Sequence, residues 1–256
     1  AAFATPVKDA THALSPFFSP DGKWLGFVEE SGGMQSAVLK KVRLSDGEEF
    51  TICPAPDLHG ATWLPDGRIV LGGMDTNGMG LSIVSAEGGK SEVIAEPDVA
   101  KREGYLMYPS ALPDGHGVLF TAGNGNGRAL SLNLLDLDSR RRTQLIAGGG
   151  AAVALSDGVL VYAADGALFV GAFDLKSRRL TGQVERLVPD VLMNLPNEPA
   201  LGHFAVSGNG TLAYLAGDAS AFRGSQVYWV DSAGAVTPIA DELRFPEPLG
   251  GGSISM

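Results

Sequence analysis

The sequence predicts an all-β protein, a β-propeller built from four-stranded blades. Three observations lead to this fold class: a tight-turn motif recurs five times, apolar strand-like segments flank each copy, and no segment shows sustained helical periodicity. Successive motifs lie about 43 to 52 residues apart, which is the length of one four-stranded blade. The five motifs are Ser19-Pro20-Asp21-Gly22, Leu64-Pro65-Asp66-Gly67, Leu112-Pro113-Asp114-Gly115, Ser156-Asp157-Gly158 and Gly208-Asn209-Gly210.

Each motif joins a short strand to a strongly apolar second strand. Asp-Gly and Asn-Gly supply the positive backbone φ that a tight hairpin turn needs. A third and a fourth strand follow in each repeat and are separated by a second turn, most clearly at 86–89, 137–139 and 232–234. The predicted second strands are 24–28, 68–71, 117–120, 159–162 and 211–214.

A four-stranded sheet with two apolar faces must be covered on both sides. Stacking such sheets around an axis buries both faces and leaves only short edges. The larger aromatic side chains are therefore expected to pack between blades. These residues are Trp24, Phe27, Trp63, Phe120, Phe204 and Trp229.

The whole chain, 1–256, is expected to form one propeller domain. The expected segments are the outer strand of a preceding blade (1–10), repeats at about 11–57, 58–106, 107–149, 150–197 and 198–245, and a tail (246–256).

Composition narrows the range of partners. The chain is 45% apolar and 19% charged and contains 35 glycines, which indicates a globular protein with many tight turns. Its formal net charge of -10 argues against binding to nucleic acid. No long uncharged apolar run is present, so no membrane insertion is expected. The single cysteine, Cys53, cannot form an internal disulfide.

Several stretches resemble a known repeat family. They include 15–22, 59–67, 166–174 and 204–212, the last followed by Val227-Tyr228-Trp229-Val230-Asp231. The sequence resembles TolB-like and WD-like propellers, and most of all the propeller attached to bacterial serine/threonine protein kinases. This resemblance implies a bacterial sensor or interaction module that is extracytoplasmic (periplasmic) if it belongs to a sensor kinase. The shared residues are turn and core positions, so they indicate the fold rather than a chemistry.

The resemblance also implies that part of a blade is missing. The family pattern calls for another Ser-Pro-Asp-Gly turn after Pro248, but the sequence continues as Leu249-Gly250-Gly251-Gly252. We therefore expect an incomplete six-bladed propeller that closes on five blades, fills the gap with its tails, or forms a homodimer through open blade edges.

Three histidines precede the turn motif in different repeats. In a propeller the strand before this turn is innermost, so His12, His59 and His203 are expected to approach one mouth of the axial channel. Three imidazoles can bind Zn²⁺ or another divalent metal. Further candidates for a metal ligand or a general base in the same entry segments are Asp57, Glu103 and Glu198. The alternative is that these are unconnected polar residues of the channel wall.

Two functions remain open at this point. The sequence contains no Gly-x-Ser-x-Gly elbow, Walker loop, His-Glu-x-x-His or dinucleotide-binding glycine motif. The first hypothesis is a binding module that takes a small molecule or a protein at the channel mouth. The second is a metal-dependent hydrolase acting on an ester, lactone or phosphotriester, with the histidines as metal ligands and no other cofactor.

Overall fold

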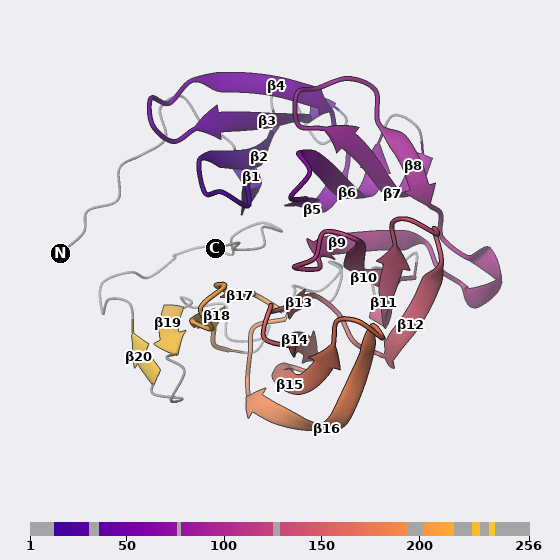
Figure 1. The fold of residues 1–256 in the computed structure, drawn as a ribbon, viewed down its shortest axis with the longest axis vertical. Coiled ribbons are helices and arrows are strands. Elements are labelled where there is room, and N and C mark those ends of the chain that lie inside the picture. Colours follow the sequence, from indigo (N-terminus) through magenta and orange to yellow (C-terminus); the bar gives the residue numbers. More distant parts are fainter. Residues whose placement is uncertain are drawn as a thin grey trace.

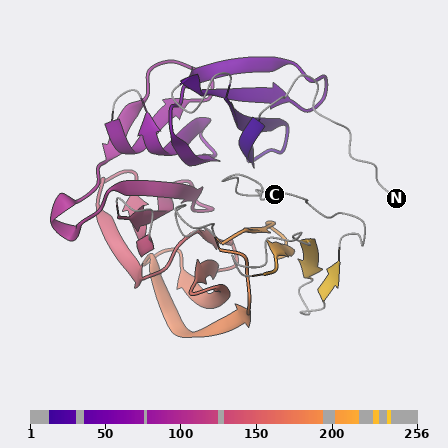
Figure 2. The same ribbon diagram turned by 180° about the vertical axis from the view of Figure 1, so that it is seen from behind.

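The computed structural model describes residues 13–30, 36–75, 78–124, 129–193, 202–217, 227–230 and 236–238. These residues form five antiparallel four-stranded sheets arranged around a common axis (Figures 1 and 2). The predicted β-propeller of four-stranded blades is therefore confirmed. Within the described part of the chain helical structure is limited to short 3-10 turns, such as Val99–Lys101, and no helix there could cross a lipid bilayer.

Each sheet is formed by four strands consecutive in sequence. The first sheet contains β1 (Ala13–Phe18), β2 (Trp24–Glu29), β3 (Val38–Arg43) and β4 (Glu49–Pro54). The second contains β5 (Leu58–Trp63), β6 (Arg68–Asp75), β7 (Gly78–Ser85) and β8 (Glu92–Ala95). The third contains β9 (Tyr105–Ala111), β10 (Gly117–Gly123), β11 (Ala129–Asp136) and β12 (Arg142–Ala147). The fourth contains β13 (Ala152–Ala154), β14 (Val159–Ala164), β15 (Ala167–Asp174) and β16 (Arg179–Val188). The fifth contains β17 (Phe204–Val206), β18 (Leu212–Leu215), β19 (Val227–Val230) and β20 (Val236–Pro238).

The first strand of each sheet lies nearest the axis, as the sequence predicts (Figure 1). The hairpin that follows it depends on a glycine with positive φ, for example +67° at Gly22 and +85° at Gly67. In the first turn Asp21 accepts hydrogen bonds from the Ser19 hydroxyl (2.7 Å) and the Lys23 backbone N–H (3.1 Å). These bonds to the ionised form lower the pKa of Asp21 to about 2.

Apolar side chains fill the space between neighbouring sheets. Four clusters of buried residues fill the boundaries between neighbouring sheets. They join the first sheet to the second, the second to the third, the third to the fourth and the fourth to the fifth. Trp63, Phe120 and Phe204 lie in these clusters and Trp24 packs against the first, as expected. Phe27 is buried but belongs to none of the four clusters.

Ion pairs cross three of the same boundaries. Lys41 of the first sheet reaches Glu87 of the second at 2.8 Å, and Arg140 of the third reaches Glu92 of the second at 3.2 Å. Arg178 of the fourth sheet pairs with Asp136 of the third. Lys41 is buried, and its Nζ lies 4.6 Å from the centre of the Trp24 ring. The Lys41–Glu87 ion pair and this cation–π contact therefore add to the apolar packing at the first boundary.

Some of the predicted features belong to segments near the two ends of the chain. The predicted outer strand at 1–10, the tail at 246–256 and the side chain of Trp229 lie outside the described residues. The derivation from a six-bladed parent therefore stays a prediction.

The second and third sheets approach each other closely at Gly72. A Cβ atom at this position would lie 2.8 Å from Cδ of Pro109 and 3.1 Å from Cα of Met107. These are backbone and ring atoms that cannot rotate away, so the close approach requires glycine.

We predict that Gly72→Ala lowers the free energy of unfolding by about 1–3 kcal/mol, the usual cost of overpacking. Gly208→Ala is the matched control, because a Cβ there meets nothing within 4 Å. Urea denaturation of both variants and the wild type measures the difference. Equal stability of the two variants would contradict this account of the boundary.

Candidate functional site

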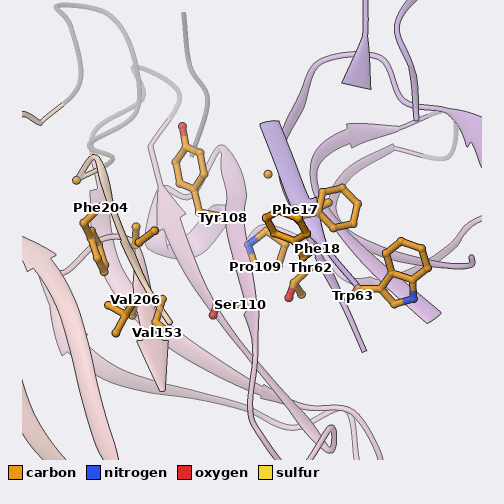
Figure 3. Close-up of a pocket in the computed structure, with 16 residues that line it drawn as sticks. Phe17, Phe18, Thr62, Trp63, Tyr108, Pro109, Ser110, Val153, Phe204 and Val206 are labelled. Atoms are coloured by element: carbon orange, nitrogen blue, oxygen red, sulfur yellow. The ribbon is translucent and has the colours of Figure 1, made fainter. Parts of the chain in front are cut away.

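A cavity of about 160 Å³ lies on the axis of the propeller. It is lined by residues on or next to the innermost strands of all five sheets. Figure 3 shows Phe18 and Trp63 on one side, Val153 and Phe204 on the other, and Ser110 between them. The cavity is therefore a product of the whole ring rather than of one blade.

Bulges in the innermost strands shape this cavity. The pairing register shifts within β1, β5 and β9, and the bulged residues Ser15, Gly60 and Tyr108 have φ of +50°, +91° and +52°. Each stands six residues before the Asp of its turn motif. Pro16 and Pro109 follow two of them and have no N–H to donate to a ladder. A bulge of this kind redirects the side chains after it, here toward the channel.

Two hydroxyl groups on the cavity wall belong to the strand segments after these bulges. Thr62 Oγ1 accepts a hydrogen bond from the backbone N–H of Ala111 at 3.1 Å, which ties the second sheet to the third. The Ser110 hydroxyl makes no hydrogen bond to any described residue. Both groups border the cavity in Figure 3. They are neutral groups able to donate a hydrogen bond to a guest.

A wider opening of about 670 Å³ lies at the end of the channel where the Pro-Asp-Gly turns lie. Phe18 and Trp63 line both spaces, and Pro20, Pro65 and Pro113 surround the opening. We call these two adjoining spaces the funnel. Neither set of lining residues contains a charged side chain.

Sequence reasoning missed the funnel, although a signal was available. Phe18, Trp63, Ala111, Ala154 and Val206 each stand three residues before the Asp or Asn of their motif. Equal spacing from the turn puts them at one height on the channel wall. Of these five residues, Trp63 is the one that the sequence predicts to pack between blades, and it does lie in the cluster between the first and second sheets as well as on the channel wall.

Asp57 and His59 come together at the start of β5, the end of this strand away from its turn. His59 Nε2 lies 3.3 Å from Asp57 Oδ1, and both side chains are partly exposed. The imidazole meets the rings of Tyr105 and Tyr108 edge to face, at centroid distances of 6.1 and 6.4 Å. The carboxylate and the two tyrosine rings of the next sheet therefore restrict the orientation of the imidazole.

Glu103 is held in a different environment. Its two carboxylate oxygens each accept a hydrogen bond of 2.6 Å from Arg142, and Oε2 also accepts one from the Asp98 backbone N–H at 2.8 Å. The Arg142 guanidinium lies 5.0 Å from the centre of the Phe120 ring and also reaches Asn133. The Glu103 side chain is only 2% exposed. The ion pair thus fastens the connection before β9 to the outer strand β12.

The remaining candidates do not assemble with this pair in the described structure. His203 is buried in the fifth sheet, where loss of solvent lowers its pKa and keeps the imidazole neutral at pH 7. His12 and Glu198 lie outside the described residues. Where side chains are described, no three His, Cys, Asp or Glu groups gather as a metal site would require. The three-histidine site therefore stays a prediction.

Comparison with known proteins places the fold but not the activity. No family model and no curated protein matches the sequence. A TolB-like protein from Agrobacterium tumefaciens superposes with a TM-score of 0.69 at 15% identity, over 95% of this chain and 85% of that one. Regucalcin, a calcium-binding protein from the same organism, gives 0.62 at 14% identity, with 95% and 77% covered. A gluconolactonase from Xanthomonas campestris gives 0.62 at 16% identity, with 93% and 77% covered. The chain is thus similar to TolB-like and gluconolactonase-type propellers in fold.

For Glu103→Gln we expect a loss of about 3 kcal/mol in unfolding free energy. The substitution leaves the Arg142 charge, 18% exposed, without its counter-charge in a largely buried place. Glu92→Gln is the matched control, because the Glu92–Arg140 pair is exposed and should be worth less than about 1 kcal/mol. Chemical denaturation compares the two, and a similar small loss in both would show that Glu103 is not a structural anchor.

Proposed function

We propose that this chain is a binding module that takes its ligand in the axial channel. The observation that carries the proposal is the funnel, an axial cavity beside a wider opening, lined mostly by apolar side chains with a few hydroxyl groups among them. Sites for small ligands generally combine concave apolar walls with a few polar groups that fix orientation. The occupant is either a small molecule or one side chain inserted by a partner protein.

The wider setting of this module is also a proposal. Its sequence resembles the propellers attached to bacterial serine/threonine kinases, and its fold is similar to that of a TolB-like protein. Both likenesses support a sensor or interaction part of a larger bacterial protein in an extracytoplasmic, periplasmic location. Association of two copies through open blade edges is a further proposal that follows from the expected missing blade.

Filling the channel tests the binding function. Ser110→Leu places a larger apolar side chain in the cavity, and we expect it to abolish binding of small uncharged fragments that the wild type binds. Ser45→Leu, at an exposed serine outside the funnel, is the control and should bind as the wild type does. Ligand-observed NMR with a library of fragments of about 8 to 15 non-hydrogen atoms measures both. If no fragment shows binding that Ser110→Leu removes, the channel is not the binding site.

A metal-dependent hydrolase is the second candidate, and the Asp57–His59 contact favours it. A carboxylate beside an imidazole is a common part of a divalent metal site, and a bound metal would make water a better nucleophile toward an ester or lactone. His12, His203 and Glu198 are further candidate ligands that the sequence offers; His12 and Glu198 lie outside the described residues. The fold likeness to a gluconolactonase and to a calcium-binding regucalcin is consistent with this candidate.

The hydrolase candidate predicts that His59→Ala loses bound zinc and hydrolysis together. The test loads the protein with Zn²⁺, removes free metal by gel filtration, and measures metal content and turnover of 4-nitrophenyl acetate and a lactone. His116→Ala is the control, because His116 forms an exposed pair with Asp138 at 3.0 Å and should change neither quantity. Equal zinc content in the two variants, or hydrolysis that survives His59→Ala, would remove this candidate.

A further inference from the structure

The funnel narrows from the turn end of the channel toward its centre. Phe18 and Trp63 border both the outer opening of about 670 Å³ and the inner cavity of about 160 Å³. Together the two spaces reach the size range of sites that hold small organic ligands. A ligand that enters from the turn end therefore passes these two rings before it reaches the inner cavity.

The outer part of the funnel has a rigid aromatic wall. Phe18 is 38% exposed, whereas its neighbour Phe17 is 3% exposed and packs 6.1 Å from the Trp63 ring. Alternation along β1 thus sends Phe17 into the core and leaves Phe18 on the channel. Packing against Phe17 restricts the orientation of the Trp63 ring. A ligand that covers an exposed aromatic face gains free energy from burial of apolar surface. A ligand that itself carries an aromatic ring gains further from edge-to-face or offset stacking.

The polar groups of the funnel are neutral. Thr62 and Ser110 offer hydroxyls, and the innermost strands offer peptide groups. A charged ligand would lose its water here without meeting an opposite charge, which is costly. The net charge of -10 on the chain adds a penalty for an anion. The wall therefore discriminates against ions of either sign.

We infer that the funnel takes a neutral molecule with one aromatic ring and one hydrogen-bonding group, the ring against Phe18 and Trp63 and the polar group at Thr62 and Ser110. This inference rests on the proposed binding function and specifies the class of its ligand. The geometry places the ring at the wide end, because Thr62 and Ser110 border the inner cavity, whereas the Ser19 hydroxyl at the opening already donates a hydrogen bond to Asp21 at 2.7 Å.

Four probes of similar size test the inference: benzyl alcohol, cyclohexylmethanol, benzoate and benzylammonium. Dissociation constants from ligand-observed NMR titration should be lowest for benzyl alcohol. We expect cyclohexylmethanol to bind about three- to tenfold more weakly, because it lacks the stacking contribution of an aromatic pair. Benzoate and benzylammonium should bind at least about tenfold more weakly, because each brings an unpaired charge.

A variant identifies the ring that gives the preference. Phe18→Leu keeps an apolar side chain at an exposed position, so the fold should survive, but it should bring benzyl alcohol and cyclohexylmethanol to nearly equal affinity. Phe169→Leu is the control, since Phe169 stacks on Tyr162 outside the funnel and should leave the preference unchanged.

The outcomes separate this inference from the proposed function. If benzoate, benzylammonium or cyclohexylmethanol binds as well as benzyl alcohol and Ser110→Leu removes that binding, the channel is a ligand site but the inferred ligand class is wrong. An aromatic preference that persists in Phe18→Leu also overturns the inference. If none of the four probes shows binding sensitive to Ser110→Leu, both the inference and the proposed channel site fail.

Discussion

Each four-stranded sheet of this protein carries apolar side chains on its two faces, and only another sheet can cover them. Leu39 and Ile69 belong to the buried cluster at the first boundary, Val70 and Val118 to the cluster at the second, and two further clusters fill the third and fourth boundaries. Burial of this apolar surface is the main favourable term in the folding of the ring. Ion pairs such as Lys41–Glu87 lie at the same boundaries, where they supplement apolar packing.

The funnel follows from the same constraint. When sheets stack side by side around an axis, their innermost strands face one another across a narrow space, and every blade contributes a few residues to its wall. Bulges at Ser15, Gly60 and Tyr108 then decide which side chains face the channel and which join the core. Phe17 and Phe18 are adjacent in sequence, but Phe17 is buried at the boundary between two sheets and borders only the inner cavity, whereas Phe18 is partly exposed and lines both parts of the funnel.

Much of the fold was predictable because its signals are local. An Asp-Gly or Asn-Gly dipeptide sets its own turn, and the apolar strand after it is readable within a few residues, so five repeats and the innermost strands follow from the sequence. The site was less predictable because it depends on contacts between distant residues. Glu103 and Arg142 are 39 positions apart, and nothing near Glu103 in the sequence indicates that its carboxylate is occupied by a guanidinium. Its place before β9 alone made it look like a channel residue.

The histidines illustrate the same limit. The sequence correctly brings His59 close to Asp57, its neighbour in the chain, but the environment of each imidazole depends on the next blade. Tyr105 and Tyr108 flank His59, whereas His203, at the position equivalent to Tyr108 in its own repeat, is buried among apolar residues. Equivalent positions in a repeat share a backbone path but not a chemical setting, and this is why spacing alone could not define the site.

Residues of the innermost strands surround a channel wide enough for a small molecule or a single side chain but too narrow for a bulky polymer. The most direct test of this central claim is the reactivity of a cysteine placed at Ser110 in a Cys53→Ser background, with Ser45→Cys as the exposed reference. The account predicts that the cysteine at 110 reacts with methyl methanethiosulfonate but not with a polymer-linked maleimide, whereas the cysteine at 45 reacts with both. Rapid reaction of position 110 with the polymer reagent, or no reaction with either reagent, would contradict the channel.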